Sequence, residues 1–219
     1  MSDSPRILGL DEAGRGCVLG PLVIGAFCCT TDELDALDAT GATDSKALSA
    51  KKREKIRQLL LEIGSHSLEY ISPQQIDAGN INTLEEEAFI RMIIRFQPTH
   101  CIIDAPVHPR GIPALTLRLE RALAEAGVSA PAWTIEPKAD GNYRPCGAAS
   151  IFAKQARDAI IHTLGPVGSG YPSDPKTRAW LLGFIERDET FPDCVRTRWG
   201  TIDSLRQQHL FGSGAPEAS

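Results

Sequence analysis

Two adjacent carboxylates, Asp11 and Glu12, stand at the end of a short apolar segment near the start of the chain. A short apolar run bounded by glycine is typical of a buried strand. The acids therefore lie beside a low-dielectric core, where their mutual repulsion is relieved by protonation, a cation or a metal ion. The turn that follows, Gly14-Arg15-Gly16, offers backbone N–H groups and a guanidinium, which suit phosphate. Together these residues suggest metal-assisted chemistry on a phosphate group.

A plainer interpretation competes on this segment alone, because such acids are often a solvated turn and Gly-Arg-Gly is often a simple loop. Two further acids follow apolar strands in the same way: Asp104 ends one at 101–104, and Asp140 comes shortly after one at 132–135. The carboxyl ends of parallel strands meet in one crevice, so all four acids are expected to converge. Such oxygen ligands suit Mg²⁺ or Mn²⁺. A pair of these ions would activate a water and stabilise a leaving oxygen at phosphorus.

Hydrophobic patterning predicts the elements that position these acids. Strands are expected at 6–10, 20–29, 67–71, 101–104 and 132–135. Helices are expected at 51–63 with Ser49 as N-cap, at 83–96 opened by a capping box at Thr83, at 113–126 stopped by Gly127, at 148–162, after Asp174-Pro175, and at 202–209. Strands first, then alternating helices and strands, indicate an α/β fold with a mixed sheet.

Length and composition favour one soluble domain. Residues 1–211 are expected to form it, with a C-terminal helical extension from about 174, and 212–219 are expected to be a disordered tail. The absence of an apolar stretch of about 18 residues argues against a membrane helix. The chain enters its first strand within a few residues, which argues against a signal peptide and predicts a cytoplasmic protein. A net charge of −5 argues against a passive nucleic-acid coat protein, whereas a metal-dependent nuclease can be acidic overall.

The cysteines and histidines show no spacing that predicts a metal site. Six cysteines without a Cys-x-x-Cys pair are expected to be reduced thiols. No Cys/His spacing fits a closed zinc site. The five histidines are therefore expected to be structural or surface residues.

Several ordered motifs together resemble one family. They are Asp11–Gly16, Thr43–Lys46, Ile103–Ala105, Lys138–Asp140, Ala148–Lys154, Arg157-Asp158 and Gly168–Thr177. In this order they resemble type 2 ribonuclease H (ribonuclease HII), with C-terminal motifs in the manner of its archaeal and eukaryotic catalytic members. The similarity covers about residues 6–205, nearly the whole chain.

The resemblance implies a fold and an activity. The fold would be ribonuclease H-like: a mixed five-stranded sheet flanked by helices, with a small C-terminal helical extension that helps to clamp the duplex. The activity would be cleavage of RNA in RNA–DNA hybrids and cutting beside single ribonucleotides in duplex DNA, as in ribonucleotide excision repair, leaving 5′-phosphate and 3′-hydroxyl ends. The catalytic metal ligands map to Asp11, Glu12, Asp104 and Asp140.

The resemblance also maps residues that select the ribose. Gly14, Arg15 and Gly16 correspond to the turn that senses the 2′-hydroxyl through backbone groups, which fits because this hydroxyl distinguishes RNA from DNA and glycine allows close approach. Tyr171 corresponds to the tyrosine that stacks where the next nucleotide is a deoxyribose. The alternative for Tyr171 is a buried core tyrosine before a proline turn.

Four residues resemble the family's phosphate contacts: Ser45, Lys46, Ser150 and Lys154. Ser150 is expected near the N-terminal end of its helix, where N–H groups favour anions, and Lys154 follows one turn later. Lys154 has the alternative of simply reaching solvent. Asp158 is expected to form a salt bridge near Lys154 or Arg157, so it is kept out of the metal set.

The chain departs from the family pattern near the fourth acid and near the C-terminus. Arg144 is inserted between Tyr143 and Pro145, and Gly147 replaces a serine. The C-terminal segment Arg196-Thr197-Arg198-Trp199-Gly200-Thr201 resembles an Arg-x-Ser-Trp segment of archaeal-like members, with Arg198 where serine is usual.

Two alternative functions remain. One is a related nuclease, directed at DNA or of type 3, without single-ribonucleotide specificity; the other is a non-catalytic hybrid-binding protein. The partners expected are RNA–DNA hybrid and ribonucleotide-containing duplex DNA. We expect a monomer, with a sliding clamp as a partner for which no clear motif exists.

Overall fold

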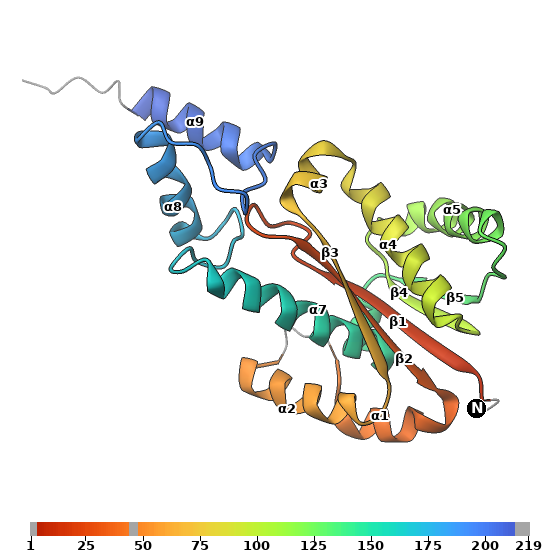
Figure 1. Cartoon of the computed structure of the whole chain (residues 1–219). Coiled ribbons are helices and arrows are strands. Elements are labelled where there is room, and N and C mark those ends of the chain that lie inside the picture. Colours follow the sequence, from red (N-terminus) through yellow and green to blue (C-terminus); the bar gives the residue numbers. More distant parts are fainter. Residues whose placement is uncertain (1–3, 44–47, 213–219) are drawn as a thin grey trace, which may run out of the picture.

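A five-stranded sheet forms the centre of the computed structural model, which describes residues 4–43 and 48–212 (Figure 1). The strand order is β3-β2-β1-β4-β5. β1 (Arg6–Ala13) pairs antiparallel with β2 (Leu22–Thr30), which pairs antiparallel with β3 (Ser65–Ile71). On its other side β1 lies parallel to β4 (His100–Asp104), and β4 lies parallel to β5 (Ala132–Glu136). The predicted mixed five-stranded sheet is confirmed.

Helices cover both faces of this sheet (Figure 1). α7 crosses one face and packs with α1 and α2, α4 and α5 cover the other face, and α8 and α9 lie together at one end. The helices are α1 (Leu34–Thr40), α2 (Ala50–Leu61), α3 (Pro73–Ala78), α4 (Ile81–Phe96), α5 (Ile112–Glu125), α6 (Ala139–Asn142), α7 (Arg144–Thr163), α8 (Pro175–Glu186) and α9 (Gly200–Gly212), with 3-10 turns η1 (Thr31–Glu33) and η3 (Pro109–Gly111). Within the described ranges, no helix has the length and apolarity to cross a membrane.

α7 packs directly on the backbone of the central strands. A Cβ atom on Gly9 of β1 would lie 2.1 Å from the carbonyl carbon of Pro145, and one on Gly25 of β2 would lie 2.4 Å from the oxygen of Ala149. These two glycines therefore bring the start of α7 against the sheet. On the opposite face, alternate residues of β1, such as Leu8, enter the core beneath α4 and α5.

β1 is longer than predicted. The strand continues beyond Leu10, because Asp11 and Glu12 pair with Gly25 and Ile24 of β2. The pairing with β4 stops earlier, at Leu10. The two acids therefore belong to a strand with one unpaired edge, not to a turn after it.

Two predicted helix caps are confirmed. The Ser49 side chain accepts the Lys52 N–H at the start of α2, and the Asp174 side chain accepts the Lys176 N–H at the start of α8. Gly127 ends α5 in the left-handed region, at φ +71°, as its position after the helix predicts.

Two predicted helix starts are wrong. The capping box at Thr83 does not form, because Asn80 caps α4 and accepts the N–H groups of Asn82 and Thr83. α7 begins at Arg144 instead of 148, with Pro145 in its first turn, where a missing N–H is tolerated. The short helices α1, α3 and α6 were not predicted.

All six cysteines are free thiols, and five of them are buried.

Candidate functional site

Three of the predicted acids meet at one end of the central strands. Asp11 comes from β1, Asp104 ends β4, and Asp140 lies in α6. One carboxylate oxygen from each lies within 4.8 Å of the others. The register explains this meeting, since Leu10 is the last residue of β1 that pairs with β4, opposite Ile103.

Asp140 reaches this group because α6 is tied to the end of β4. An Asp104 oxygen accepts the N–H of Ala139, the first residue of α6, at 3.2 Å. Lys138 adopts the left-handed region, at φ +64°, so the chain turns sharply between β5 and α6. Asp140 then lies in the first turn of the short helix, buried beside the two strand acids.

The electrostatics of this cluster favour a bound cation. Asp11 is only 4 % exposed. Burial raises the pKa of Asp11 well above its usual range, and the charges of Glu12, Asp104 and Asp140 raise it further, whereas a hydrogen bond with Ser150 lowers it. A divalent cation among these oxygens would relieve the repulsion, and an all-carboxylate donor set fits Mg²⁺ or Mn²⁺.

Glu12 stands apart from the group of three that the described residues form. Successive side chains of a strand point to opposite faces, so Glu12 leaves β1 on the side opposite to Asp11. It is half-buried, and its charge is the second-largest cause of the raised pKa of Asp11. Glu12 therefore acts on the cluster through its charge from the neighbouring position.

Directly after β1 the chain forms a tight turn. Cys17 donates its N–H to the carbonyl oxygen of Gly14 at 3.2 Å. Gly14 has φ +89°, and a Cβ there would lie 2.8 Å from the oxygen of Pro21. Gly16 is exposed, and a Cβ there would meet no described atom within 4 Å. The turn thus needs glycine at position 14 for its shape, whereas at position 16 glycine leaves the backbone bare to solvent.

The Arg15 side chain is held by α4. Its Nε lies 3.4 Å from an oxygen of Glu85, and its guanidinium also donates to Asn82. Glu85 is 1 % exposed, and both its oxygens lack a hydrogen-bond partner among the described residues. Burial raises the pKa of Glu85 to about 7, although the charge of Arg15 lowers it.

Tyr171 lies over a buried arginine. The Arg157 guanidinium carbon is 5.1 Å from the centre of the Tyr171 ring, a cation–π arrangement. Arg157 donates to the Cys17 sulfur at 2.9 Å and to Asp158 at 3.1 Å. Burial raises the pKa of Tyr171 to about 12, but the side chain keeps partial exposure. Tyr171 is therefore not a wholly buried core tyrosine.

The predicted phosphate contacts differ in their surroundings. Ser150 is buried and hydrogen-bonded to Asp11. It is the seventh residue of α7, so the prediction that it lies near a helix N-terminus is wrong. Lys154 donates to Asp158 at 2.7 Å, which is the predicted salt bridge of Asp158. Ser45 and Lys46 lie outside the described residues.

The two departures near Asp140 have structural consequences. A Cβ on Gly147 would lie 2.8 Å from the backbone carbonyl oxygen of Asp140 and 2.8 Å from the Thr43 Cα atom. The inserted Arg144 donates to the Ala42 oxygen at 2.8 Å. Glycine therefore lets Thr43 and α6 approach α7, and Arg144 binds the adjoining Ala42.

Arg196 is a residue that pattern analysis missed. It lies between α8 and α9, is fully buried, and donates hydrogen bonds to the carbonyl oxygens of Gly14, Arg15 and Gly20. Its segment resembled a family motif without an assigned role, and no periodic pattern marks a single buried arginine. The only available signal was its place two residues before Arg198, in a cluster of cationic and aromatic residues.

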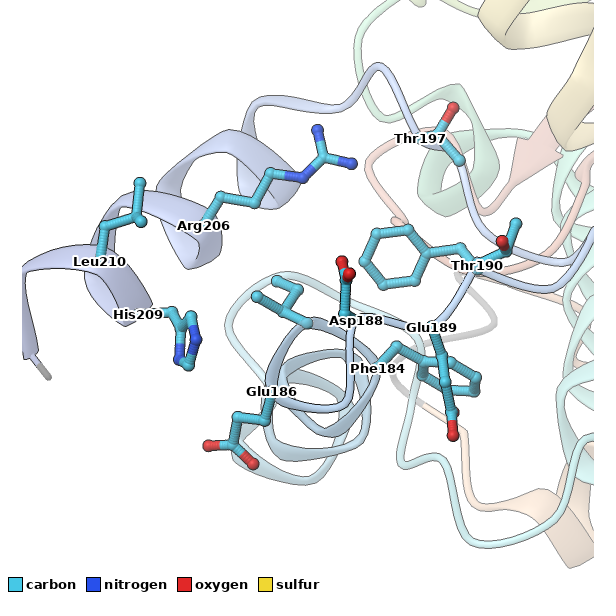
Figure 2. Close-up of a pocket in the computed structure, with 11 residues that line it drawn as sticks. Phe184, Glu186, Asp188, Glu189, Thr190, Thr197, Arg206, His209 and Leu210 are labelled. Atoms are coloured by element: carbon cyan, nitrogen blue, oxygen red, sulfur yellow. The ribbon is translucent and has the colours of Figure 1, made fainter.

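A separate hollow of about 660 Å³ opens between α8 and α9 (Figure 2). Acidic side chains, among them Glu186, Asp188 and Glu189, line it together with Arg206 and His209. None of the residues that line it belongs to the carboxylate cluster. Because its charges are mixed, it does not offer the cationic strip that a nucleic-acid backbone needs.

Comparisons with known proteins agree on one family. The family model for ribonuclease HII matches residues 8–202. Ribonuclease HII of Archaeoglobus fulgidus is 37 % identical over 210 residues, covering 92 % of this chain and 97 % of the relative. The crystal structure of ribonuclease H2 from Pyrococcus horikoshii superposes with a TM-score of 0.79 at 36 % identity, covering 93 % of this chain and 98 % of that one.

Two further solved structures bear on partners and fold. The ribonuclease HII in a complex with PCNA from Archaeoglobus fulgidus has a TM-score of 0.80 and 38 % identity, covering 94 % of this chain and 99 % of that one. Bst-RNase HIII in complex with Mn²⁺ has a TM-score of 0.73 at 18 % identity, covering 92 % of this chain and 69 % of that one, and so shows a shared fold alone.

Proposed function

The chain belongs to the ribonuclease HII family, and from this premise we propose that it cuts duplex DNA on the 5′ side of single embedded ribonucleotides. As a member of this family it is a ribonuclease H, an endonuclease of the hydrolase class. We propose continuous RNA–DNA hybrids as its second substrate. The observation that carries the proposal is the meeting of Asp11, Asp104 and Asp140 near the end of β1, the strand that leads into a turn with an exposed Gly16.

The proposed cofactor is Mg²⁺ or Mn²⁺, held by Asp11, Asp104 and Asp140, with Glu12 contributing charge from its adjacent position. Two such ions, when bound, supply a nucleophilic water and stabilise the leaving 3′-oxygen, which leaves 5′-phosphate and 3′-hydroxyl ends. Hydrogen bonds within the chain hold two of these acids in place. Ser150 and the N–H of Glu12 direct hydrogen bonds at Asp11, and the N–H of Ala139 directs one at Asp104.

Selection of the ribose is assigned to the Gly14–Gly16 turn and Tyr171. The bare backbone at Gly16 supports this role, because a 2′-hydroxyl both donates and accepts hydrogen bonds and can be read by backbone groups. Tyr171, which is partly exposed, is proposed to lie against a sugar that lacks the hydroxyl. Lys154, Ser45 and Lys46 are proposed to contact the phosphate backbone; Ser150 is assigned to Asp11 instead.

The experiment that tests this function compares three duplexes of one sequence: all DNA, DNA with one ribonucleotide, and a continuous RNA–DNA hybrid. Each is incubated with the protein and Mg²⁺ or Mn²⁺, and the end groups of the products are identified. We expect one cut on the 5′ side of the ribonucleotide and no cut in all-DNA duplex. Cleavage of the all-DNA duplex would favour a DNA-directed nuclease, and binding without any cut would favour a non-catalytic hybrid-binding protein.

A sliding clamp is a proposed partner, supported by the relative that was solved in a complex with PCNA. We propose that the protein itself is monomeric and cytoplasmic, and that it serves ribonucleotide excision repair. Gel filtration of the chain alone and with a clamp tests both the monomer and the partner. We expect the chain alone to elute as a monomer and to elute as a complex when the clamp is added.

A further inference from the structure

Arg196 is buried and donates hydrogen bonds to the backbone of the glycine turn. Its Nη2 donates to the Gly14 oxygen at 2.7 Å, its Nη1 donates to the Arg15 oxygen at 2.9 Å, and its Nε donates to the Gly20 oxygen at 3.1 Å. All three nitrogens of one guanidinium thus donate hydrogen bonds to backbone carbonyls of residues 14–20. Arg196 is 0 % exposed, so it does not reach a bound substrate and acts through the turn.

This buried cation has a large desolvation penalty, which the three carbonyls and one aromatic ring offset. Burial lowers the pKa of Arg196 to about 10. The guanidinium carbon lies 5.0 Å from the centre of the Trp199 ring. A planar guanidinium directs several hydrogen bonds at fixed angles, whereas a lysine ammonium is a single point of charge on a flexible stem. The geometry of the turn therefore depends on arginine and not on positive charge alone.

The same short stretch of chain, Cys17–Gly20, also contacts the Tyr171 loop, which is residues 164–174 between α7 and α8. Val18 donates its N–H to the Gly170 oxygen at 2.9 Å, and the Arg196 N–H donates to the Val18 oxygen at 2.9 Å. From the other side, Arg157 donates to the Cys17 sulfur and to the Ser169 oxygen. The glycine turn and the Tyr171 loop are thus connected through this stretch, and Arg196 is hydrogen-bonded to the stretch at Val18 and Gly20.

We propose that Arg196 is a positioning residue for ribose recognition, which sets the Gly14–Gly16 turn at the distance from Tyr171 that matches one nucleotide step. The inference rests on the proposed function and deepens it. A single ribonucleotide in DNA satisfies both elements in only one register. A continuous hybrid offers a 2′-hydroxyl in every register, so it tolerates a displaced turn.

The test measures kcat/KM on the single-ribonucleotide duplex and on the continuous hybrid, for wild type and Arg196→Lys. The expected result is a loss on the single-ribonucleotide duplex that exceeds the loss on the hybrid by about tenfold or more, within the range that misplacement far from the chemistry produces. The matched control is Asp77→Asn. Asp77 accepts the N–H and hydroxyl of Thr197 and so ties the same C-terminal segment to α3 without touching the turn.

Three results would overturn the inference: equal losses on both substrates in Arg196→Lys, no loss on either, or the same change of ratio in Asp77→Asn. Thermal unfolding shows whether each variant is folded. If Arg196→Lys does not fold, Trp199→Leu carries the test, because it keeps the arginine and removes the ring that packs on it. A smaller change of ratio in the same direction supports the inference, and an unchanged ratio overturns it. A wild type that ignores the single ribonucleotide would instead overturn the proposed function itself.

Discussion

The carboxylate cluster and the glycine turn are adjacent in space but are built in opposite ways. The cluster gathers three carboxylates at one place, and strand register brings its members together. The turn consists of backbone, and two buried arginines, Arg157 and Arg196, hold it and its neighbouring loop from positions far along the chain. One region would be completed by the proposed metal ion, whereas the other is completed within the protein.

This difference separates the two tasks of the molecule. We assign the cleavage step to the sheet, whose paired strands hold the acids in place. Selectivity is assigned to a connection between the N-terminal turn and the C-terminal segment. A change in the first region should therefore remove cleavage on every substrate, whereas a change in the second should alter the choice among substrates.

The largest expected effect comes from Asp11→Asn. Because changes even to the residues behind a metal ligand weaken metal binding or activity by about 10–100-fold, loss of the ligand itself should lower cleavage of both substrates by at least about a hundredfold. The raised pKa of Asp11 shows that its charge is unfavourable without metal. Thermal unfolding in EDTA at neutral pH should therefore show the variant to be more stable than wild type.

The control for this prediction is Asp35→Asn, which changes an exposed acid of α1. Both cleavage and stability should stay at the wild-type level. An Asp11→Asn variant that cuts either substrate normally would remove Asp11 from the proposed metal site and end the separation of the two regions.

Next in size is Gly9→Ala, which tests the packing that holds the sheet side. The new methyl carbon would lie 2.1 Å from the Pro145 backbone, and overpacking against a backbone that cannot move aside should destabilise the fold by about 3 kcal/mol. Gly200→Ala is the matched control, because a Cβ there meets no described atom within 4 Å. Urea unfolding of both variants measures the difference. Equal stabilities would mean that α7 does not press on β1 as described.

Glu85→Gln should change how stability depends on pH. The pKa of Glu85 is about 7 in the folded chain against an ordinary value of 4.5. Between these pH values the folded state keeps a proton that the unfolded state has lost, so wild-type stability falls as the pH rises through this window. The variant lacks this slope, and its advantage over wild type should grow to about 3 kcal/mol by pH 8.

Glu125→Gln is the control for Glu85→Gln, because Glu125 forms an ion pair with Arg121 on the exposed side of α5. Unfolding free energies of all three proteins between pH 4 and pH 8, in EDTA, make the comparison. Parallel curves for wild type and Glu85→Gln would contradict the burial of an acid behind Arg15.

The smallest expected effect on stability belongs to Gly16→Ala. The added methyl meets no described atom within 4 Å, so the free energy of unfolding should change by no more than about 0.5 kcal/mol, as for most surface substitutions. Cleavage at a single ribonucleotide should nevertheless fall about tenfold, because the methyl stands where backbone must approach the sugar. Unaltered cleavage would remove Gly16 from the substrate contacts.

Sequence patterns predicted the cluster better than the turn, and the reason is physical. Apolar runs that end in acids mark strand ends, and parallel strands must place those ends at one edge. The convergence of Asp11, Asp104 and Asp140 could therefore be predicted from local patterns. The continuation of β1 through Glu12 could not, because a polar residue continues a strand only where a partner such as Ile24 accepts it.

The features that could not be predicted depend on contacts between residues that are far apart in the sequence. Thr83 and Asn80 both suit an N-cap, and the fold uses Asn80, so that Thr83 lies inside the first turn of α4. The sequence motifs that contain Arg157 and Arg196 do not indicate that these side chains are buried. Only the fold shows that each is buried against residues about 140 to 180 positions away.

The most direct test of the account compares wild type with Asp104→Asn on a DNA duplex that carries one ribonucleotide. Both proteins are first shown to bind the duplex in EDTA, and Mg²⁺ or Mn²⁺ is then added. The account predicts a single cut on the 5′ side of the ribonucleotide by wild type, only with metal, and binding without cleavage by the variant. Wild-type rates of cleavage by Asp104→Asn, or a wild type that binds the duplex and never cuts it with either metal, would contradict it.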